Sequence, residues 1–392
     1  MIRQTLAITG VNLRSIPSRW GPSLVIIIGL AGVVAVFTAL LSMAAGFEAT
    51  LQATGSDDCA MILRGGSAAE LNSALAINDA SLIRLKPGIR KNADGKPLAS
   101  AELVVITELF RKGETMNGSN ISMRGVDPVA FELRPGLKVI DGEMFHSGRR
   151  EMIVGIGVTR QFAGATLGST LRMRGSEWKV VGVFSSGDAH ESEIWCDAAI
   201  AQSTFDRPGY TSILAGLEPE GGLKTLQDAL AADPQLNADA RTEREYYASQ
   251  TDDFRMSIGI LAGVVTIIMA FGAIFAALNT MYAAVATRTR EIGTLRAIGF
   301  GAMPVLVSVM VEAVTLSIIG GALGAALAWL MFDNLSVSTL GSNFTQVVFA
   351  FRVTPQLVMG GLIISIAIGF VGGLLPAWRA ARLPVTTALR TS

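Results

Sequence analysis

The segment Arg288-Thr-Arg-Glu-Ile-Gly-Thr-Leu-Arg-Ala-Ile-Gly-Phe300 is a short charged stretch between two long apolar runs. Ile258–Ala284 precedes it and Val305–Phe332 follows it, and neither run contains a lysine or an arginine. A hydrocarbon core about 30 Å thick requires roughly 20 apolar residues in a helix, so each run is long enough to span a membrane. The segment is therefore predicted to connect two transmembrane helices.

Composition places the whole chain among membrane proteins. Of its 392 residues, 50% are hydrophobic and only 16% are charged, which is too apolar for an ordinary soluble protein. Two further runs, Ser23–Ala45 and Leu357–Leu375, are also long enough to span a bilayer. Basic and acidic residues balance at 32 each, so the net charge gives no indication of nucleic-acid binding. The prediction is an α-helical membrane protein with four transmembrane helices.

The basic residues predict which side of the membrane each segment occupies. Lysine and arginine near helix ends are retained in the cytoplasm. Three groups of arginines flank the runs: Arg3, Arg14 and Arg19; Arg288, Arg290 and Arg296; and Arg379, Arg382 and Arg390. Both termini and the connector are therefore predicted to be cytoplasmic, and Gly46–Arg255 and Asp333–Pro355 to be external.

The N-terminal region has two interpretations. Ser42-Met-Ala44 resembles a signal-peptide cleavage site, but the run before it exceeds the usual ~7–15-residue apolar core of a signal peptide. Its removal would also leave an odd number of spans, so we favour a retained helix. Ile2–Trp20 alternates apolar and basic residues, which is typical of an amphipathic helix on the inner membrane surface with Trp20 as an interfacial anchor.

The segment between the first and second spans has the composition of a soluble domain. Strands are expected at Ala60–Leu63, Glu102–Thr107, Ile121–Arg124, Glu151–Val154 and Trp178–Phe184. Helices are expected at Ala68–Ala76, Asp79–Leu85, Gly157–Ala163 and Leu223–Ala232. The pattern predicts an α+β domain of two lobes, and roughly 200 residues can bury a core of their own. Its ends, Phe47–Thr54 and Arg241–Phe254, are expected to continue the adjacent spans as a helical stalk.

The external segment contains both cysteines and both histidines. An oxidising compartment would permit a disulfide between Cys59 and Cys196; the alternative is two separately buried thiols. His146 and His190 have no metal-ligand spacing around them, so no metal site is predicted. His190 lies in the acidic run Gly187–Glu193, which admits a metal or catalytic interpretation, but we favour a solvated loop.

Enzyme motifs are absent from the sequence. The pair Gly95-Lys96 is followed by Pro97 and lacks the upstream glycine of a phosphate-binding loop. There is no Gly-x-Ser-x-Gly nucleophile turn and no His-Glu-x-x-His zinc helix. We expect a non-catalytic chain that binds no cofactor, so a partner would have to supply any nucleotide site.

Polar and small residues inside the apolar runs predict how the helices pack. A carboxylate at the centre of a lipid-facing helix costs about 2.5–3.5 kcal/mol, so Glu312 should face other helices. One hypothesis makes it a proton or substrate site; the other, which we favour, is an interhelical hydrogen bond to Asn279 or Thr280. Gly320 to Gly324 and Gly369 to Gly373 repeat at helical spacing, which predicts close helix packing rather than a wide pore.

The connector itself has the pattern of a short helix. Arg288, Glu291 and Leu295 recur at helical spacing, and Glu291 can pair with Arg288 or Arg296, although surface pairs contribute only ~0–1 kcal/mol. Its apolar face is expected to contain Ile292, Leu295 and Ile298, and its glycines to permit tight turns. It is either a loop that sets topology or a helix that docks into a cytoplasmic partner.

Several segments resemble the MacB/FtsX-like ABC transporter permeases of the mechanotransmission type. Arg290–Gly299 resembles that family's cytoplasmic connector, and Leu375–Arg390 its C-terminal tail. Val311–Gly324 is similar to its third span, including the glutamate. Arg124–Pro128 and Trp178–Phe184, followed by Glu193–Trp195, are similar to its periplasmic core domain. The resemblance covers nearly the whole chain.

The resemblance implies a homodimer, or a pair of related permeases, in the bacterial inner membrane. Two separate ATPase subunits would bind ATP and Mg, and a periplasmic membrane-fusion adaptor and an outer-membrane channel are further expected partners. The connector would seat on the ATPase and transmit its motion without an open channel. The residues implied in this coupling are Arg288, Arg290, Glu291, Ile292, Gly293, Leu295, Arg296, Ala297 and Gly299. MacB carries its ATPase on the same chain, whereas this chain begins almost directly at the membrane-surface helix.

These inferences divide the chain into nine segments. They are 1–22, a membrane-surface helix; 23–46, 255–286, 303–332 and 356–376, the spans; 47–254, the periplasmic domain and stalk; 287–302, the coupling helix; 333–355, a periplasmic loop; and 377–392, a cytoplasmic tail. The expected function is export or extraction of a drug, peptide, lipid or lipoprotein. The alternative is an FtsX-like permease that activates a cell-wall hydrolase without transport. A membrane-anchored periplasmic enzyme has no supporting site.

Overall fold

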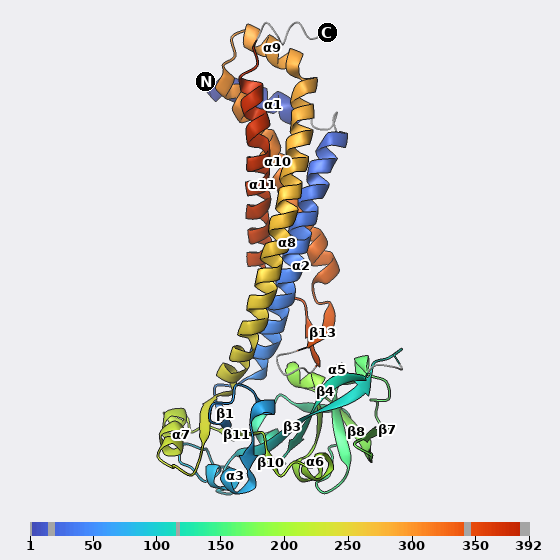
Figure 1. Cartoon of the computed structure of the whole chain (residues 1–392), viewed down its shortest axis with the longest axis vertical. Coiled ribbons are helices and arrows are strands. Elements are labelled where there is room, and N and C mark those ends of the chain that lie inside the picture. The colour runs from blue at the N-terminus through green and yellow to red at the C-terminus, as the bar shows by residue number, and fades with distance from the viewer. Residues whose placement is uncertain (1, 15–19, 115–117, 341–345, 385–392) are drawn as a thin grey trace. The chain divides into compact units, whose positions relative to one another are not determined.

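The computed structural model describes residues 2–14, 20–114, 118–340 and 346–384. It divides into two compact units (Figure 1). The helical unit contains Met1–Ala45, Met256–Leu335 and Phe351–Ser392, and the mixed unit contains Gly46–Arg255 and Ser336–Ala350. Of the arginines that predict topology, Arg19 and Arg390 lie outside the described residues, as does the end of the 377–392 tail.

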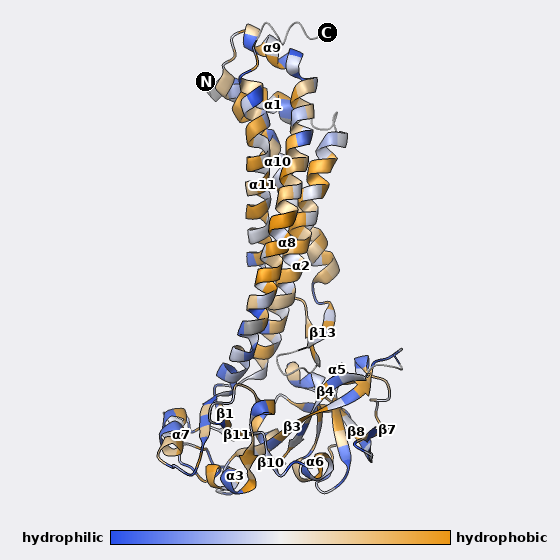
Figure 2. Ribbon diagram, viewed as in Figure 1, coloured by the Kyte–Doolittle hydropathy of each residue, from blue (hydrophilic) through white to orange (hydrophobic). Residues whose placement is uncertain are grey.

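Within the described residues, four helices are long and apolar enough to cross a membrane (Figure 2). They are α2 (Trp20–Thr54), α8 (Glu243–Thr287), α10 (Ala302–Phe332) and α11 (Pro355–Ala381). Two shorter helices, α1 (Ile2–Arg14) and α9 (Thr289–Ala297), complete the helical unit. The prediction of four spans, with a mixed domain inserted after the first, is confirmed.

Small residues let these helices approach closely. The predicted positions of close packing are Gly320, Gly324, Gly369 and Gly373. A Cβ at Gly324 would collide with the backbone of Ala31 in α2, and a Cβ at Gly373 would collide with the side chain of Ala313 in α10. The helices therefore approach closely at the predicted glycines, as small-residue repeats allow.

The N-terminal helix packs one face against α10. Ile8 is 5% exposed and belongs to the same hydrophobic cluster as Val305 and Val309, and the Asn12 side-chain amide donates to the Ser308 hydroxyl. The predicted amphipathic helix is therefore present as far as Arg14, but its buried face includes protein contacts that the membrane-surface interpretation did not anticipate.

Among the described residues, the mixed unit is built on one ten-stranded sheet. Its order is β12-β1-β11-β3-β4-β9-β6-β8-β5, with β7 paired to β8. The strands are β1 (Cys59–Arg64), β3 (Ala99–Phe110), β4 (Gly118–Val126), β5 (Lys138–Gly142), β6 (Glu151–Gly155), β7 (Thr170–Met173), β8 (Ser176–Ser185), β9 (Ile194–Asp197), β11 (Ser212–Gly216) and β12 (Ala238–Thr242). There are also two separate two-stranded sheets. One pairs β2 (Leu75–Ala76) with β10 (Gly209–Tyr210), and the other pairs β13 (Ser336–Leu340) with β14 (Gln346–Ala350).

Strand β3 joins the two halves of this sheet. Its first residues pair with β11 and its residues from Leu103 onward pair with β4, both antiparallel. One half packs on α3 (Ile77–Ile83) and α7 (Gly222–Ala231), and the other on α5 (Ile156–Gln161) and α6 (Ala198–Phe205), while α4 (Ala130–Leu133) follows β4. Separate hydrophobic clusters fill the two halves, which agrees with the predicted two lobes.

One local prediction is wrong and two segments have detail that was not predicted, for tertiary reasons. Ala68–Ala76 is not a helix: it contains the 3-10 turn η2 (Glu70–Asn72) and then β2, which pairs with the distant β10. The helix expected over Arg241–Phe254 is present from Glu243 onward, and the two residues before Glu243 end β12, which pairs with β1. The segment after α10 contains the β13–β14 hairpin, whose Phe349 packs edge-on against Phe47 in the mixed unit.

A buried arginine organises the face of the sheet opposite the α6 core. Arg124 in β4 is 2% exposed and donates to three carboxylates: Glu70 at 2.7 and 3.0 Å, Glu102 at 2.8 Å and Glu193 at 2.8 and 3.0 Å. Arg134 donates to Glu102 at 2.6 Å. Burial alone would raise the pKa of Glu102, but Arg134 and Arg124 together lower it to about 2. The carboxylate is therefore ionised because two guanidinium groups replace its water.

His190 is part of this buried layer, so the predicted solvated loop is wrong. The histidine lies in the 3-10 turn η3 (Ala189–Ser192) and is 1% exposed. Its Nδ1 lies 3.2 Å from Asp188 and its Nε2 lies 3.3 Å from the Tyr247 hydroxyl. Its ring meets Trp195 edge to face. No group of residues that could hold a metal ion occurs in the part of the chain that the structure describes.

The two cysteines are free, buried thiols, which decides between the two alternatives in favour of separately buried thiols. Cys59 is in β1 and Cys196 in β9, and β11, β3 and β4 lie between these strands in the sheet. Neighbouring strands are about 4.8 Å apart, whereas a disulfide joins Cα atoms only about 4.4–6.8 Å apart. Burial raises the pKa of Cys59 to about 12 and that of Cys196 as well, so both sulfurs stay protonated and unreactive.

Replacing Arg124 with methionine is expected to destabilise the mixed unit by about 3–5 kcal/mol, because the three carboxylates would lose their shared cation. Urea unfolding, monitored by hydrogen exchange of the amides in β3 and β4, measures the loss of stability. The control is Lys138→Met, at an exposed position in β5. Equal losses in the two variants would show that the cluster contributes nothing beyond an ordinary surface charge.

His190 predicts a pH dependence of stability. Burial lowers its pKa, but the carboxylate of Asp188 outweighs burial and raises the pKa above 6.5. A raised pKa in the folded state contributes stability that is complete below the unfolded value and is lost as pH rises through the folded value. The stability difference between wild type and His190→Gln should therefore be larger at pH 5.5 than at pH 9. Thermal unfolding at the two pH values tests this, with the exposed His146→Gln as the control.

Candidate functional site

The predicted connector is the helix α9, and its ends follow from its sequence. Arg288 is the residue before the first turn, where α8 stops, and Gly299 follows the last turn with φ of 105°. The Phe300 amide donates to the Leu295 carbonyl at 3.1 Å and the Gly299 amide to the Arg296 carbonyl at 3.1 Å. These two bonds form a Schellman motif, which needs the left-handed conformation that glycine adopts without strain. Gly299 therefore ends the helix.

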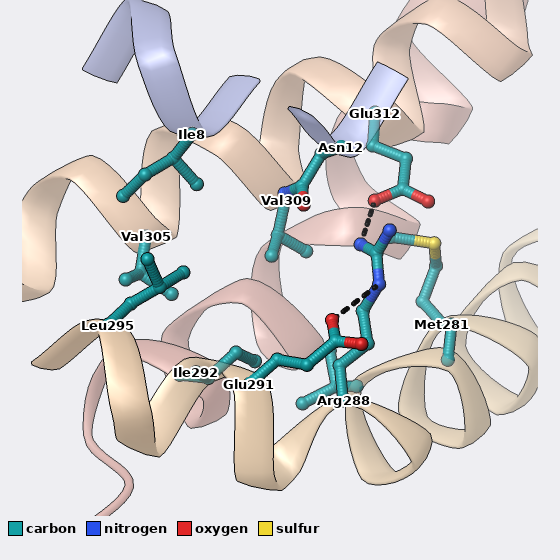
Figure 3. A pocket seen from close by; sticks show the side chains of 12 residues that line it. Ile8, Asn12, Met281, Arg288, Glu291, Ile292, Leu295, Val305, Val309 and Glu312 are labelled. Carbon is teal, nitrogen blue, oxygen red and sulfur yellow. Dashed lines mark hydrogen bonds and ion pairs between the residues drawn. The ribbon is translucent and has the colours of Figure 1, made fainter. Parts of the chain in front are cut away.

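One face of α9 is packed against the helical unit. Ile292 and Gly293 are buried and Leu295 is half-buried, and Ile292 shares a hydrophobic cluster with Ile8 of α1 and Val305 of α10. Figure 3 shows Ile292 and Leu295 lining one pocket together with Ile8 and Val305. The predicted apolar face is present except for Ile298, which is 72% exposed.

A buried ion pair joins the start of α9 to α10. The Arg288 guanidinium donates to the Glu312 carboxylate at 3.1 Å, and both side chains are at most 10% exposed. Figure 3 shows Arg288 between Glu312 and Glu291, whose carboxylate lies 3.9 Å away. Removing one partner of a buried pair typically costs about 3–5 kcal/mol, since the other charge stays buried without compensation. Glu312 is therefore held by Arg288, and the expected bond to Asn279 or Thr280 is replaced by this pair.

A second polar contact joins α9 to the end of α11. Arg296 donates to the carbonyl oxygens of Ala381 at 3.2 Å and Leu383 at 2.5 Å. The last carbonyls of a helix have no partners within the helix, so the guanidinium group supplies donors that α11 lacks. The expected pair between Glu291 and Arg296 is not observed among the described residues.

The opposite face of α9 is exposed. Arg290, Glu291, Thr294, Ala297 and Ile298 follow one another at helical spacing and are all exposed, as is Gly299. The nine residues of the predicted coupling set therefore separate into two groups. Those that point inward hold the helix in place: Arg288, Ile292, Gly293, Leu295 and Arg296. Those that remain available to a partner are Arg290, Glu291, Ala297 and Gly299.

The cavity beside α9 is too small for a substrate. Its volume is about 30 Å³, and its lining includes Arg288, Glu291 and Glu312. Small-molecule sites usually measure ≈300–1,000 Å³, and a space of this size holds about one water. This cavity therefore does not provide a site for a small-molecule substrate.

Asn279 lies on the exposed side of α8. Its neighbours on the same face are apolar, since Phe271 is 60% exposed and Phe275 is 68% exposed. The residue predicted as an internal partner of Glu312 is thus a polar group on an otherwise apolar outer surface.

Sequence reasoning missed the partners of the two key arginines. Arg288 and Glu312 are separated by 24 residues, and Arg296 binds carbonyls 85 and 87 residues away. A usable signal existed for the first pair, because Arg288 at the end of one apolar run and Glu312 near the start of the next are opposite charges in apolar surroundings. No side-chain pattern identifies backbone carbonyls as acceptors.

Two family models match the chain. One, described as MacB-like periplasmic core domain, matches residues 23–233, and the other, described as FtsX-like permease C-terminal, matches residues 263–385. The first begins in α2 and covers most of the mixed unit, and the second covers α9, α10 and α11.

Named proteins are similar to the chain along most of its length. The uncharacterized ABC transporter permease YvrN of Bacillus subtilis is 26% identical over 97% of this chain and 96% of its own length. The macrolide export ATP-binding/permease protein MacB of Neisseria gonorrhoeae is 26% identical over 76% of this chain and 48% of its own length. The crystal structure of the extracellular domain of the transporter YknZ from Gram-positive bacteria matches 47% of this chain and 100% of that domain, at 16% identity and a TM-score of 0.37.

The four apolar helices and the two family models identify an inner-membrane protein with a periplasmic domain. The first model alone spans more than half of the 392 residues. The chain therefore belongs to the MacB/FtsX-like family of ABC transporter permeases.

Proposed function

We propose that this chain is the transmembrane subunit of an ABC exporter or extractor that is driven by separate ATPase subunits. ATP and Mg would be bound by the ATPase, and the substrate would be a drug, peptide, lipid or lipoprotein handled on the periplasmic side. The observation that carries the proposal is the two-sided geometry of α9. Its outer face is exposed, while its inner face is held to α10 by Arg288 and to α11 by Arg296.

The outer face of α9 is the proposed ATPase contact. Ile298 is an exposed apolar residue, and the charged Arg290 and Glu291 lie about two turns earlier on the same helix, which is the composition of an interface centre with a polar rim. A push on this face would be passed to α10 and α11 through bonds that are short and mostly buried. This arrangement requires α9 to lie in the cytoplasm, as the distribution of arginines predicts.

A second copy of the chain is the proposed partner within the membrane. An exposed amide on an apolar helix surface is stabilised when it hydrogen-bonds across a helix–helix contact, and Asn279 offers such a group on α8. We place the dimer contact on this face of α8. A periplasmic adaptor and an outer-membrane channel would act on the mixed unit. A chain that bound its ATPase and activated a hydrolase, but moved no substrate, would instead be a signalling permease.

Charge reversal at Glu291 together with Ile298→Asp is expected to reduce co-purification of the ATPase at least about tenfold, equivalent to 1.4 kcal/mol or more. Both side chains are exposed, and the 3.9 Å contact of Glu291 with Arg288 is a surface pair of ~0–1 kcal/mol, so the chain itself should stay folded. Lys179→Glu, at an exposed position in β8, is the control for a charge change elsewhere. Undiminished co-purification of the double variant would rule out α9 as the docking helix.

Variants of the Arg288–Glu312 pair are expected to keep ATPase binding while losing the coupling of ATP hydrolysis to substrate. Glu312→Leu leaves Arg288 buried without its carboxylate, so stability should fall by about 3–5 kcal/mol. Adding Arg288→Met should restore most of that stability, because an apolar pair of similar volume can replace a buried ion pair. ATPase co-purification should survive in this double variant while substrate-dependent ATP hydrolysis is lost. Full hydrolysis coupled to transport in the double variant would show that the pair only stabilises the fold.

A further inference from the structure

The mixed unit contains a groove where β3 changes partners. It has a volume of about 630 Å³ and is lined by parts of three segments: Leu71–Ala76, Leu103–Ile106 and Phe205–Thr211, together with Arg174. All of these residues belong to the mixed unit. The volume lies within the ≈300–1,000 Å³ that is usual for binding sites. Figure 1 shows β3, β10 and α6 in this part of the fold.

One edge of β3 is open in this groove. Strand β11 pairs with β3 only as far as Glu102, and Thr211 then caps the strand: its amide donates to the Glu102 carbonyl and its hydroxyl accepts from the Val104 amide, both at 2.8 Å. The next residues back along the chain, Gly209 and Tyr210, pair with β2 instead of continuing along β3.

The direction of the Val104 amide identifies which backbone amides and carbonyls of β3 have no strand partner at this edge. Amides two residues apart in a strand point the same way, so the amides and carbonyls of Ile106 and Glu108 also point away from β4. No backbone partner from the described residues reaches them, and pairing resumes only at Phe110, whose carbonyl accepts from the Ala163 amide at 2.8 Å. About five residues of edge, or roughly 17 Å, are therefore available to an added strand.

The charged side chains that line the groove have one sign, and the exposed carboxylates of Asp206 and Glu108 lie outside this lining. Arg174 and Arg207 are the charged residues among those described in its lining, and no carboxylate lines it. Both arginines are exposed, and neither has an ion pair with a described carboxylate. The Arg174 guanidinium lies 5.9 Å from the centre of the Phe205 ring, which orients it beside the groove. A guanidinium group binds carboxylates in a planar, two-pronged geometry, so the groove is complementary to acidic side chains.

We propose that this groove binds an extended acidic segment of another polypeptide, which adds as a strand to the open edge of β3. Backbone hydrogen bonds to Ile106 and Glu108 would supply affinity, and carboxylates facing Arg174 and Arg207 would supply selectivity. The exposed Ile106 side chain and the apolar lining receive alternate apolar residues of the segment. Open strand edges are the sites at which extended peptides join sheets in many recognition domains.

The full chain in detergent or nanodiscs tests this by fluorescence anisotropy. The probe is a capped, fluorescein-labelled peptide of seven residues that alternates valine and glutamate. Two matched peptides accompany it. One has lysine in place of glutamate, and the other has alternate backbone amides N-methylated on the pairing edge. A short-chain phosphatidylglycerol serves as a competitor. We expect saturable binding of the acidic peptide and a loss of about tenfold or more with the lysine and N-methyl peptides.

Variants connect this binding to the groove. Arg174→Glu with Arg207→Glu should weaken binding of the acidic peptide at least about tenfold, because both carboxylate partners reverse their charge. Arg172→Glu is the matched control, since Arg172 lies in β7 two residues from Arg174 but outside the groove lining. The thermal unfolding temperature should be unchanged in both the double variant and the control, because the altered side chains are exposed.

The outcomes distinguish peptide binding in the groove from its absence and from lipid binding. No saturable binding, or equal binding by wild type and the double variant, overturns the proposal. Undiminished binding of the N-methyl peptide with full displacement by the lipid also overturns it, and makes the groove a site for an anionic lipid. The assay needs neither ATP nor the ATPase, so its result is independent of whether α9 is the docking helix.

Discussion

The ion pair between Arg288 and Glu312 is the interaction on which the arrangement of the helical unit depends. A carboxylate in α10 and a guanidinium group at the end of α8 are each costly in apolar surroundings, and each removes most of the cost of the other. Because Arg288 is also the residue directly before α9, the pair sets where this helix starts. Arg296 then sets where it ends relative to α11. A nine-residue helix that would be marginal alone is held at both ends.

The same constraint shapes the mixed unit on a larger scale. Arg124 and Arg134 compensate the buried carboxylates of Glu70, Glu102 and Glu193, and these groups come from segments far apart in the chain. The layer of charge covers the face of β3 and β4 opposite the hydrophobic cluster around α6. Strand β3 is the common element: it passes from β11 to β4, and its edge opens into the groove where that change occurs.

Local sequence patterns predicted most elements because their signals are short-range. Apolar runs of sufficient length predicted α2, α8, α10 and α11, and alternating apolar residues predicted five strands that the structure contains. The failures share a cause. The alanine-rich segment before Ala76 is helical by composition, but the Glu70 side chain is drawn to Arg124 and the segment pairs with β10. His190 has a polar neighbourhood in sequence and a buried one in space.

The sequence by itself determined the number of spans, the insertion of a mixed domain after the first span, and the helical connector with its glycine stop, because hydropathy and backbone conformation are properties of neighbouring residues. Only the tertiary structure decided which face of α9 remains free, that Glu312 pairs with Arg288, that the two cysteines lie too far apart to bond, and that β3 has an open edge. These features depend on contacts between residues distant in the chain. Compensation of a buried charge selects one partner from several that the sequence permits.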